Sequence, residues 1–371
     1  MKKSLIAMAV GAALTAPLAV QAAPTVDVSG FADIIYTYNN KGADNTGTKP
    51  NGNGTRNTTE RKFSADGEID FTASPADGVT ARLDVDLHLL DGGTSSCTDT
   101  DSNSGTGIPT TNTCAGTSTG SGATLEQAFF AWNIIQPLTL IGGVFNDPIG
   151  AEAEDAPNLN FTSHNAIFNI LNNQTALNGN NVAGVALAAG NSMVTGTVAY
   201  LDDLQETNEK NSVAAVINVM PMSGLEFEGG YVTQYKNNPT PGAGDFGAGD
   251  VWDVNGSWGQ SFGAVGASVG AEYLGTDEIF DGAYNIWAGI DLPAGLGLKA
   301  RYEASNSDIN GVDDTTAWTL YGSWQAASNL LIALEFTKVD ADKSGALDGA
   351  TGETDGNLVT AEFIANIGDF K

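Results

Sequence analysis

Carboxylate side chains alternate with apolar or small ones in one stretch near the N-terminus. Asp66, Glu68 and Asp70 occupy every second position, and Asp84 and Asp86 repeat this spacing after an intervening turn. Carboxylates gathered on one face attract cations and repel anions. The chemistry that this pattern favours is therefore the attraction of cations.

A spacing of two residues requires β-strands, because successive side chains of a strand point to opposite faces. Phe63, Ile69 and Phe71 lie on the other face of the first run, and Leu83 and Val85 on that of the second. Each run is about ten residues or longer, whereas strands of soluble sheets have ~5–6 residues and strands tilted across a bilayer about 9–11. The two runs alone fit both a soluble sandwich and a membrane barrel, because each has one dry face and one wet face.

The first 22 residues have the composition of a secretory signal peptide. Two lysines give a positive start, an apolar core follows, and Val20-Gln21-Ala22 fits a small-residue cleavage site. No later stretch has 18 uncharged apolar residues, the length that a spanning helix requires. We therefore expect residues 1–22 to be removed and residues 23–371 to be exported without a helical anchor.

The chain is strongly acidic, with a formal net charge of −29 at pH 7. Such a field repels nucleic acid, so no nucleic-acid partner is expected. Cys97 and Cys114 are the two cysteines of the chain. An even cysteine count in an exported protein suggests a disulfide between them.

The alternation continues along the chain and predicts sixteen strands. Short connectors, such as those at 74–78, 135–137, 190–192 and 259–262, alternate with mostly longer ones. Short turns at one end and long loops at the other are typical of outer-membrane barrels. We therefore predict an all-β fold: a transmembrane, antiparallel, up-and-down β-barrel of about sixteen strands, with short periplasmic turns and long external loops.

The stretch LEQAFFAWNIIQPLTLIGGVFNDPIGAEAEDAPNLNFTSHNAIF carries a more specific signal. It contains Gly143-Val144-Phe145, Pro148-Ile149-Gly150, an acidic run and Asn158-Leu159-Asn160-Phe161. This order resembles the OmpL-like β-barrel porins of Gram-negative outer membranes, although Val144 stands where Lys is usual in that family. The resemblance implies a channel in contact with outer-membrane lipid and lipopolysaccharide, with a homotrimer as the candidate assembly.

By analogy with general porins, residues 146–180 would be an inward-folding constriction loop. Its acidic residues would then face basic residues of the wall across the channel, although the loop could instead stay outside or pack at a subunit contact. Because acids outnumber bases on the inward face, we predict a cation-preferring pore. The predicted pore-lining and constriction residues are Asp66, Glu68, Asp70, Arg82, Asp84, Asp86, Asp147, Glu152, Glu154, Asp155, Lys299 and Arg301.

Residues 340–351 partly match a calcium-binding EF-hand loop. The chain has Thr351 where the pattern needs a bidentate Glu, and strands rather than helices are expected on both sides. A weak calcium site and an acidic external hairpin loop both stay open, and no other cofactor is expected. The candidate ligands are Asp340, Asp342, Ser344 and Asp348.

No enzymatic activity is expected, since nucleophilic catalysis needs a serine in contact with a base and an orienting partner, and the sequence has only two histidines, His88 and His164. We predict passive diffusion of small hydrophilic solutes through a water-filled channel. A non-conducting barrel that binds a surface partner or supports the envelope is the alternative. A secreted β-rich binding protein, soluble without detergent, is a third. The sequence does not identify the solute.

Overall fold

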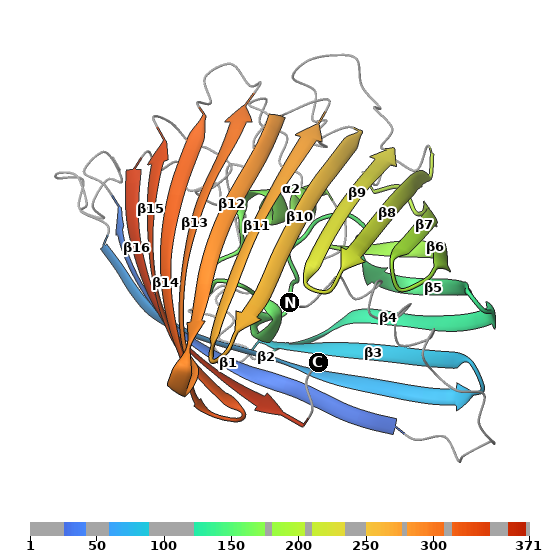
Figure 1. The fold of residues 1–371 in the computed structure, drawn as a ribbon, viewed down its shortest axis with the longest axis horizontal. Coiled ribbons are helices and arrows are strands. Elements are labelled where there is room, and N and C mark those ends of the chain that lie inside the picture. Colours follow the sequence, from blue (N-terminus) through green and yellow to red (C-terminus); the bar gives the residue numbers. More distant parts are fainter. Residues whose placement is uncertain are drawn as a thin grey trace.

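The computed structural model describes residues 26–41, 59–88, 122–174, 180–204, 210–233, 250–276, 280–307, 314–341 and 355–368. Within these ranges, sixteen antiparallel strands form one closed barrel, and β1 pairs with β16 (Figure 1). The predicted all-β, sixteen-stranded barrel is therefore confirmed. The strands are β1 (Val26–Lys41), β2 (Thr59–Ala76), β3 (Val79–His88), β4 (Gly122–Ile135), β5 (Leu138–Asn146), β6 (Asn181–Gly190), β7 (Val194–Leu201), β8 (Ser212–Met222), β9 (Leu225–Thr233), β10 (Val251–Phe262), β11 (Val265–Thr276), β12 (Phe280–Leu292), β13 (Leu296–Ser307), β14 (Thr315–Ala327), β15 (Leu330–Ala341) and β16 (Asp355–Ile367).

The two faces of the strands differ as the alternation predicts. On β15, the Leu334 side chain is 59% exposed on the outside, whereas its neighbour Glu335 is 1% exposed on the inside. The exposed apolar side chains form an outward belt, which is unfavourable in water and has the composition of a lipid-facing surface. Members of this belt include Val28, Ile34, Phe71, Leu83, Val198, Ile217, Val254, Ile286, Leu298, Leu320 and Phe363.

The strands are joined by short turns at one end of the barrel. The turn predicted at residues 259–262 is displaced, because β10 continues to Phe262 and the turn lies at Gly263 and Ala264. Gly259 pairs with Ser268 inside this hairpin. Glycine favours turns in general, but here Gly259 lies within the strand ladder.

Helical structure is limited to α2 (Ala166–Gln174) and the 3-10 turns η1 (Ala156–Asn158) and η2 (Pro293–Gly295) in the described ranges. Apolar residues of α2 recur at spacings of three and four, which gives the helix one apolar face. The Asn165 side chain begins the helix, since its Oδ1 accepts the backbone N–H of Phe168 at 2.8 Å. None of the described helices has the length and apolar character that crossing a membrane requires.

The connector between β5 and β6 lies inside the barrel. We call its described part, residues 147–174 and 180, the inner loop; it carries η1 and α2. Its residues bond to the inward side chains of β11, β13, β15 and β16, and Figure 1 shows α2 behind the strands of the wall. A segment that contacts so many strands of a closed barrel from their inner faces must occupy the lumen.

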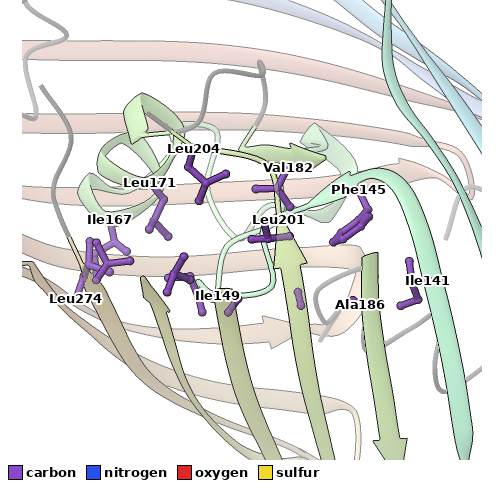
Figure 2. Packing of buried hydrophobic residues seen from close by; sticks show 14 of the residues in the cluster. Ile141, Phe145, Ile149, Ile167, Leu171, Val182, Ala186, Leu201, Leu204 and Leu274 are labelled. Atoms are coloured by element: carbon purple, nitrogen blue, oxygen red, sulfur yellow. The ribbon is translucent and has the colours of Figure 1, made fainter. Parts of the chain in front are cut away.

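A small apolar core holds the inner loop to one side of the wall. Ile149 of the loop and Ile167 and Leu171 of α2 pack against Leu201 and Leu274, which point inward from β7 and β11 (Figure 2). All five side chains are at most 2% exposed. Burial of a Leu or Ile side chain stabilises a structure by about 1.5–3 kcal/mol, so this contact is a major part of the attachment.

Candidate functional site

Besides the apolar core, hydrogen bonds hold the inner loop to the wall, with carboxylates of the wall as acceptors. Glu335 on β15 accepts the backbone N–H of Thr162 at 2.8 Å and that of Ser163 at 3.2 Å. The Thr162 hydroxyl also donates to Glu362 on β16 at 2.8 Å. Hydrogen bonds to ionised acceptors are stronger than neutral ones, so these two strands hold the loop at one fixed point.

Two further wall carboxylates, on β11 and β13, also bind the loop. Glu272 on β11 accepts the backbone N–H of Ala151 at 2.6 Å and the side chain of Asn285 at 2.9 Å. Glu303 on β13 accepts the backbone N–H of Ala166 at 3.1 Å, the first residue of α2. The first N–H groups of a helix have no partner within the helix. The wall therefore caps α2 as well as positioning it.

Arg301 on β13 lies beneath the loop, with only 3% of its surface exposed. Its guanidinium donates to the backbone oxygen of Ser163 at 2.9 Å and to the hydroxyl of the same residue at 3.0 Å. It is also 3.4 Å from Glu303 and 3.8 Å from Glu152. Arg301 therefore contacts the loop directly and does not face it across an open channel.

Lys299 and Arg82, the other two basic residues of the predicted set, are engaged in different ways. The Lys299 ammonium donates to the side chain of Asn160 in the loop at 3.0 Å. Arg82 on β3 lies 2.7 Å from Asp84 and 3.2 Å from Asp70. Its charge is thus shared among carboxylates of the wall. Asp66 on β2 and Asp86 on β3 also belong to the predicted pore-lining residues. They lie on the same inward face as Asp70 and Asp84.

The four loop acids of the predicted set have different surroundings. Glu152 accepts from the ring of His164 at 2.7 Å and from the backbone N–H of Asn165 at 3.0 Å. Burial raises the pKa of Asp147 to about 7, although the backbone N–H of Ile149 opposes this shift. The set therefore does not act as one uniform row of negative charge.

Glu154 and Asp155 lie against acids of the wall. Burial raises the pKa of Glu154 to about 12, and the adjacent Glu126 carboxyl adds to the shift. Burial also raises the pKa of Asp155, against a hydrogen-bond contribution from Glu68 that lowers it. Burial among other acids therefore disfavours the charged form of both carboxyls.

A cavity of about 250 Å³ lies between the inner loop and the wall of β9 to β13. Four carboxylates and one guanidinium line it, so acidic groups predominate over basic ones. The ring of Trp287 and several side-chain amides complete the lining. The charged residues of the lining are Glu152, Glu226, Glu228, Glu272 and Arg301.

Several sequence predictions fall outside the described residues. These are the signal peptide at 1–22, the two cysteines, and three of the four candidate calcium ligands, Asp342, Ser344 and Asp348. The fourth, Asp340, lies near the end of β15 and is exposed. The disulfide and the calcium loop therefore stay predictions.

Sequence reasoning placed the wall carboxylates on the inward face but missed their role as loop anchors. It also missed the apolar inner wall under α2. A signal for that wall is present, because β6, NVAGVALAAG, is apolar on both faces. A strand covered on both sides has such a composition, and here the inner loop supplies the second cover.

Comparison with known protein families finds no match, and no curated protein matches either. Solved structures match over most of the chain. An anion-selective porin from Comamonas acidovorans has a TM-score of 0.59 at 11% identity, covering 93% of this chain and 100% of that one. The outer-membrane channel DcaP of Acinetobacter baumannii has a TM-score of 0.58 at 12% identity, covering 94% and 99%. OprB of Pseudomonas putida has a TM-score of 0.58 at 10% identity, covering 92% and 94%. At these identities the likeness establishes the fold, and the resemblance to the OmpL-like porins stays a prediction.

Proposed function

We propose that this chain forms a water-filled channel in a Gram-negative outer membrane, through which small hydrophilic solutes diffuse passively with a preference for cations. The outward apolar belt supports contact with outer-membrane lipid and lipopolysaccharide. The inner loop would act as the constriction, because it occupies the lumen and is bonded to several strands of the wall. A homotrimer is the assembly that we propose by analogy with general porins.

The observation that carries the cation preference is the charge of the cavity between the loop and the wall. Glu226 and Glu228 on β9 lie on the side away from Arg301, whose charge is already shared with Glu152 and Glu303. Carboxylates in a narrow aqueous path concentrate cations and repel anions. The fold alone does not decide whether a channel prefers cations or anions, since one structural neighbour is an anion-selective porin.

The test is the reversal potential of the refolded protein in a planar bilayer under a KCl gradient. We expect stepwise conductance with a cation-selective reversal potential. A double variant, Glu226→Gln with Glu228→Gln, should shift the reversal potential toward the value of a non-selective channel. Asp77→Asn is the matched control, because Asp77 is an exposed acid in the β2–β3 turn, and it should leave the potential unchanged.

The other outcomes separate the parts of the proposal. Anion-selective conductance would keep the channel and reject the charge argument. A folded barrel without conductance would reject the channel and favour a structural or surface-binding barrel. A lumen that is occupied by the inner loop is compatible with that role.

A further inference from the structure

Three carboxylates converge where the inner loop meets β2 and β4. Glu68 on β2, Glu126 on β4 and Asp155, which precedes η1, each place one oxygen within 4.8 Å of the other two. Oxygens bound to a single Ca²⁺ at ~2.3–2.6 Å lie up to about 5 Å apart. The spacing of the three side chains therefore matches that of ligands around one divalent cation.

One oxygen of Glu68, Oε1, lacks a hydrogen-bond partner among the described residues. Its side chain is buried, with 3% of the residue exposed, and its Oε1 accepts no hydrogen bond from the described part of the protein. The nearest cationic atom, Nη2 of Arg82, is 3.8 Å away, beyond hydrogen-bonding distance. A buried carboxylate oxygen without a donor is unfavourable. A bound cation would supply the missing partner.

The charge of Arg82 is already committed elsewhere. Its Nε is 2.7 Å from Asp84 and its Nη2 is 3.2 Å from Asp70. Within the described ranges, no ion pair joins Glu126 or Asp155 to a basic side chain. Arg82 therefore leaves most of the negative charge of the cluster uncompensated.

A neutral oxygen lies in the same region of β4. Gln127 follows Glu126 in the chain, and its Oε1 is buried and accepts no hydrogen bond from the residues described. Its Nε2 donates to the side chain of Asn146. Calcium takes six to eight oxygens from carboxylates, amides and water, whereas Mg²⁺ demands a tighter octahedron. Three carboxylates supplemented by amide or water oxygens form a ligand set of the kind that calcium takes.

We propose that Glu68, Glu126 and Asp155 bind a divalent cation, with Ca²⁺ as the best fit, and that this ion fastens the inner loop to the wall at β2 and β4. The ion would lie on the side of the barrel opposite to β11, where Glu272 already holds the loop. This site is distinct from the calcium-like pattern at residues 340–351. The proposal does not depend on whether the barrel conducts.

The first test measures calcium binding by the full chain, refolded in detergent and freed of metal by a chelator that is then removed. Titration calorimetry with CaCl₂ should detect a site in the parent protein. The double variant Glu68→Gln with Asp155→Asn should bind at least about tenfold more weakly, as losses around metal sites commonly do. Asp342→Asn with Asp348→Asn is the matched control, since it removes acids from the other candidate loop and should leave this site intact.

A second variant and a second measurement separate loss of the site from loss of the fold. Glu126→Gln changes a partly exposed ligand, and heat-modifiable migration in gels reports whether each variant has formed its barrel. In the parent, Ca²⁺ should slow proteolysis within residues 147–174, and this protection should disappear in both site variants. Absence of calcium binding in the parent protein would overturn the proposal. It would mean that the three carboxyls share protons and do not bind an ion. Binding that survives in the site variants, or that is lost only in the 342/348 control, overturns it as well.

Discussion

The backbone N–H of Thr162 donates to Oε2 of Glu335 across 2.8 Å, and this bond joins residues 173 positions apart. Ser163 adds a second backbone donor to the same carboxylate at 3.2 Å. The acceptor is 1% exposed and lies on the inner face of β15. A carboxylate that could have lined open water thus serves as a fixed anchor for the inner loop.

Replacement of Glu335 by Gln should loosen this anchor while keeping its volume. The amide loses the charge of the acceptor, and hydrogen bonds to charged groups contribute about 1.5–3 kcal/mol. We expect docking of the loop to weaken by about 1–2 kcal/mol, which is a factor of about 5–30 in the open population. Limited proteolysis within residues 147–174 measures this, with Asp77→Asn as the control. Equal cleavage rates in parent and Glu335→Gln would show that the bond does not hold the loop.

The apolar core inside the barrel should respond more strongly than the polar anchor. Leu171→Ala removes a fully buried side chain of α2, and substitutions of this kind cost about 2–5 kcal/mol. The barrel strands should keep their pairing because their hydrogen bonds do not involve α2. Hydrogen exchange should therefore accelerate in α2 and stay slow in β6. Ile217→Ala on the outward face of β8, where the side chain is 52% exposed, is the control and should change neither.

Docking of the inner loop should depend on pH through Asp147. Burial in the docked loop raises the pKa of this carboxyl from 3.8 to about 7. The docked state therefore binds the proton more tightly than the released state, so docking is most favourable below about pH 4 and weakens as the pH rises toward 7. Hydrogen exchange of residues 147–174, corrected for intrinsic rates, should increase over this range. Asp147→Asn should make the profile shallower, with Glu154, whose pKa burial also raises, accounting for the slope that is left. An unchanged profile in that variant would exclude Asp147 as a cause.

The barrel itself was predictable because its signal is local. Alternation within each strand and the contrast between short and long connectors are both visible in the sequence, and both follow from one lipid-facing and one inward face. The error at residues 259–262 has a local cause too. A glycine favours a turn in general, but Gly259 lies within the ladder of β10 and β11, opposite Ser268.

The arrangement inside the barrel was much less predictable, because its contacts join distant parts of the chain. Glu272 meets Ala151 across 121 positions, and Glu362 meets Thr162 across 200. Alternation assigns both carboxylates to the inward face, yet it cannot distinguish an acid that faces water from one that caps a loop. Basic residues show the same limit, since Arg301 is buried by the loop that it was expected to face.

Gly230 on β9 offers the sharpest test of how the inner loop docks. A Cβ atom at this position would lie 2.3 Å from Cγ2 of Ile149, so the loop approaches β9 where the strand has no side chain. The adjacent Gly229 points to the other face, with Phe227 and Tyr231, and a Cβ there would meet only the backbone oxygen of Asp253, at 3.9 Å. The two glycines therefore form a matched pair with the same intrinsic cost of substitution.

Gly230→Ala should displace Ile149 from the apolar core, and overpacking of this kind costs about 1–3 kcal/mol. We expect faster hydrogen exchange in residues 147–174 and, if the barrel conducts, a larger and noisier single-channel current, because a displaced loop no longer narrows the lumen uniformly. Gly229→Ala should behave as the parent in both measurements. Parent-like behaviour of both variants would mean that the loop does not rest against β9 in the membrane, and a defect in both would indicate a general effect of alanine on the strand.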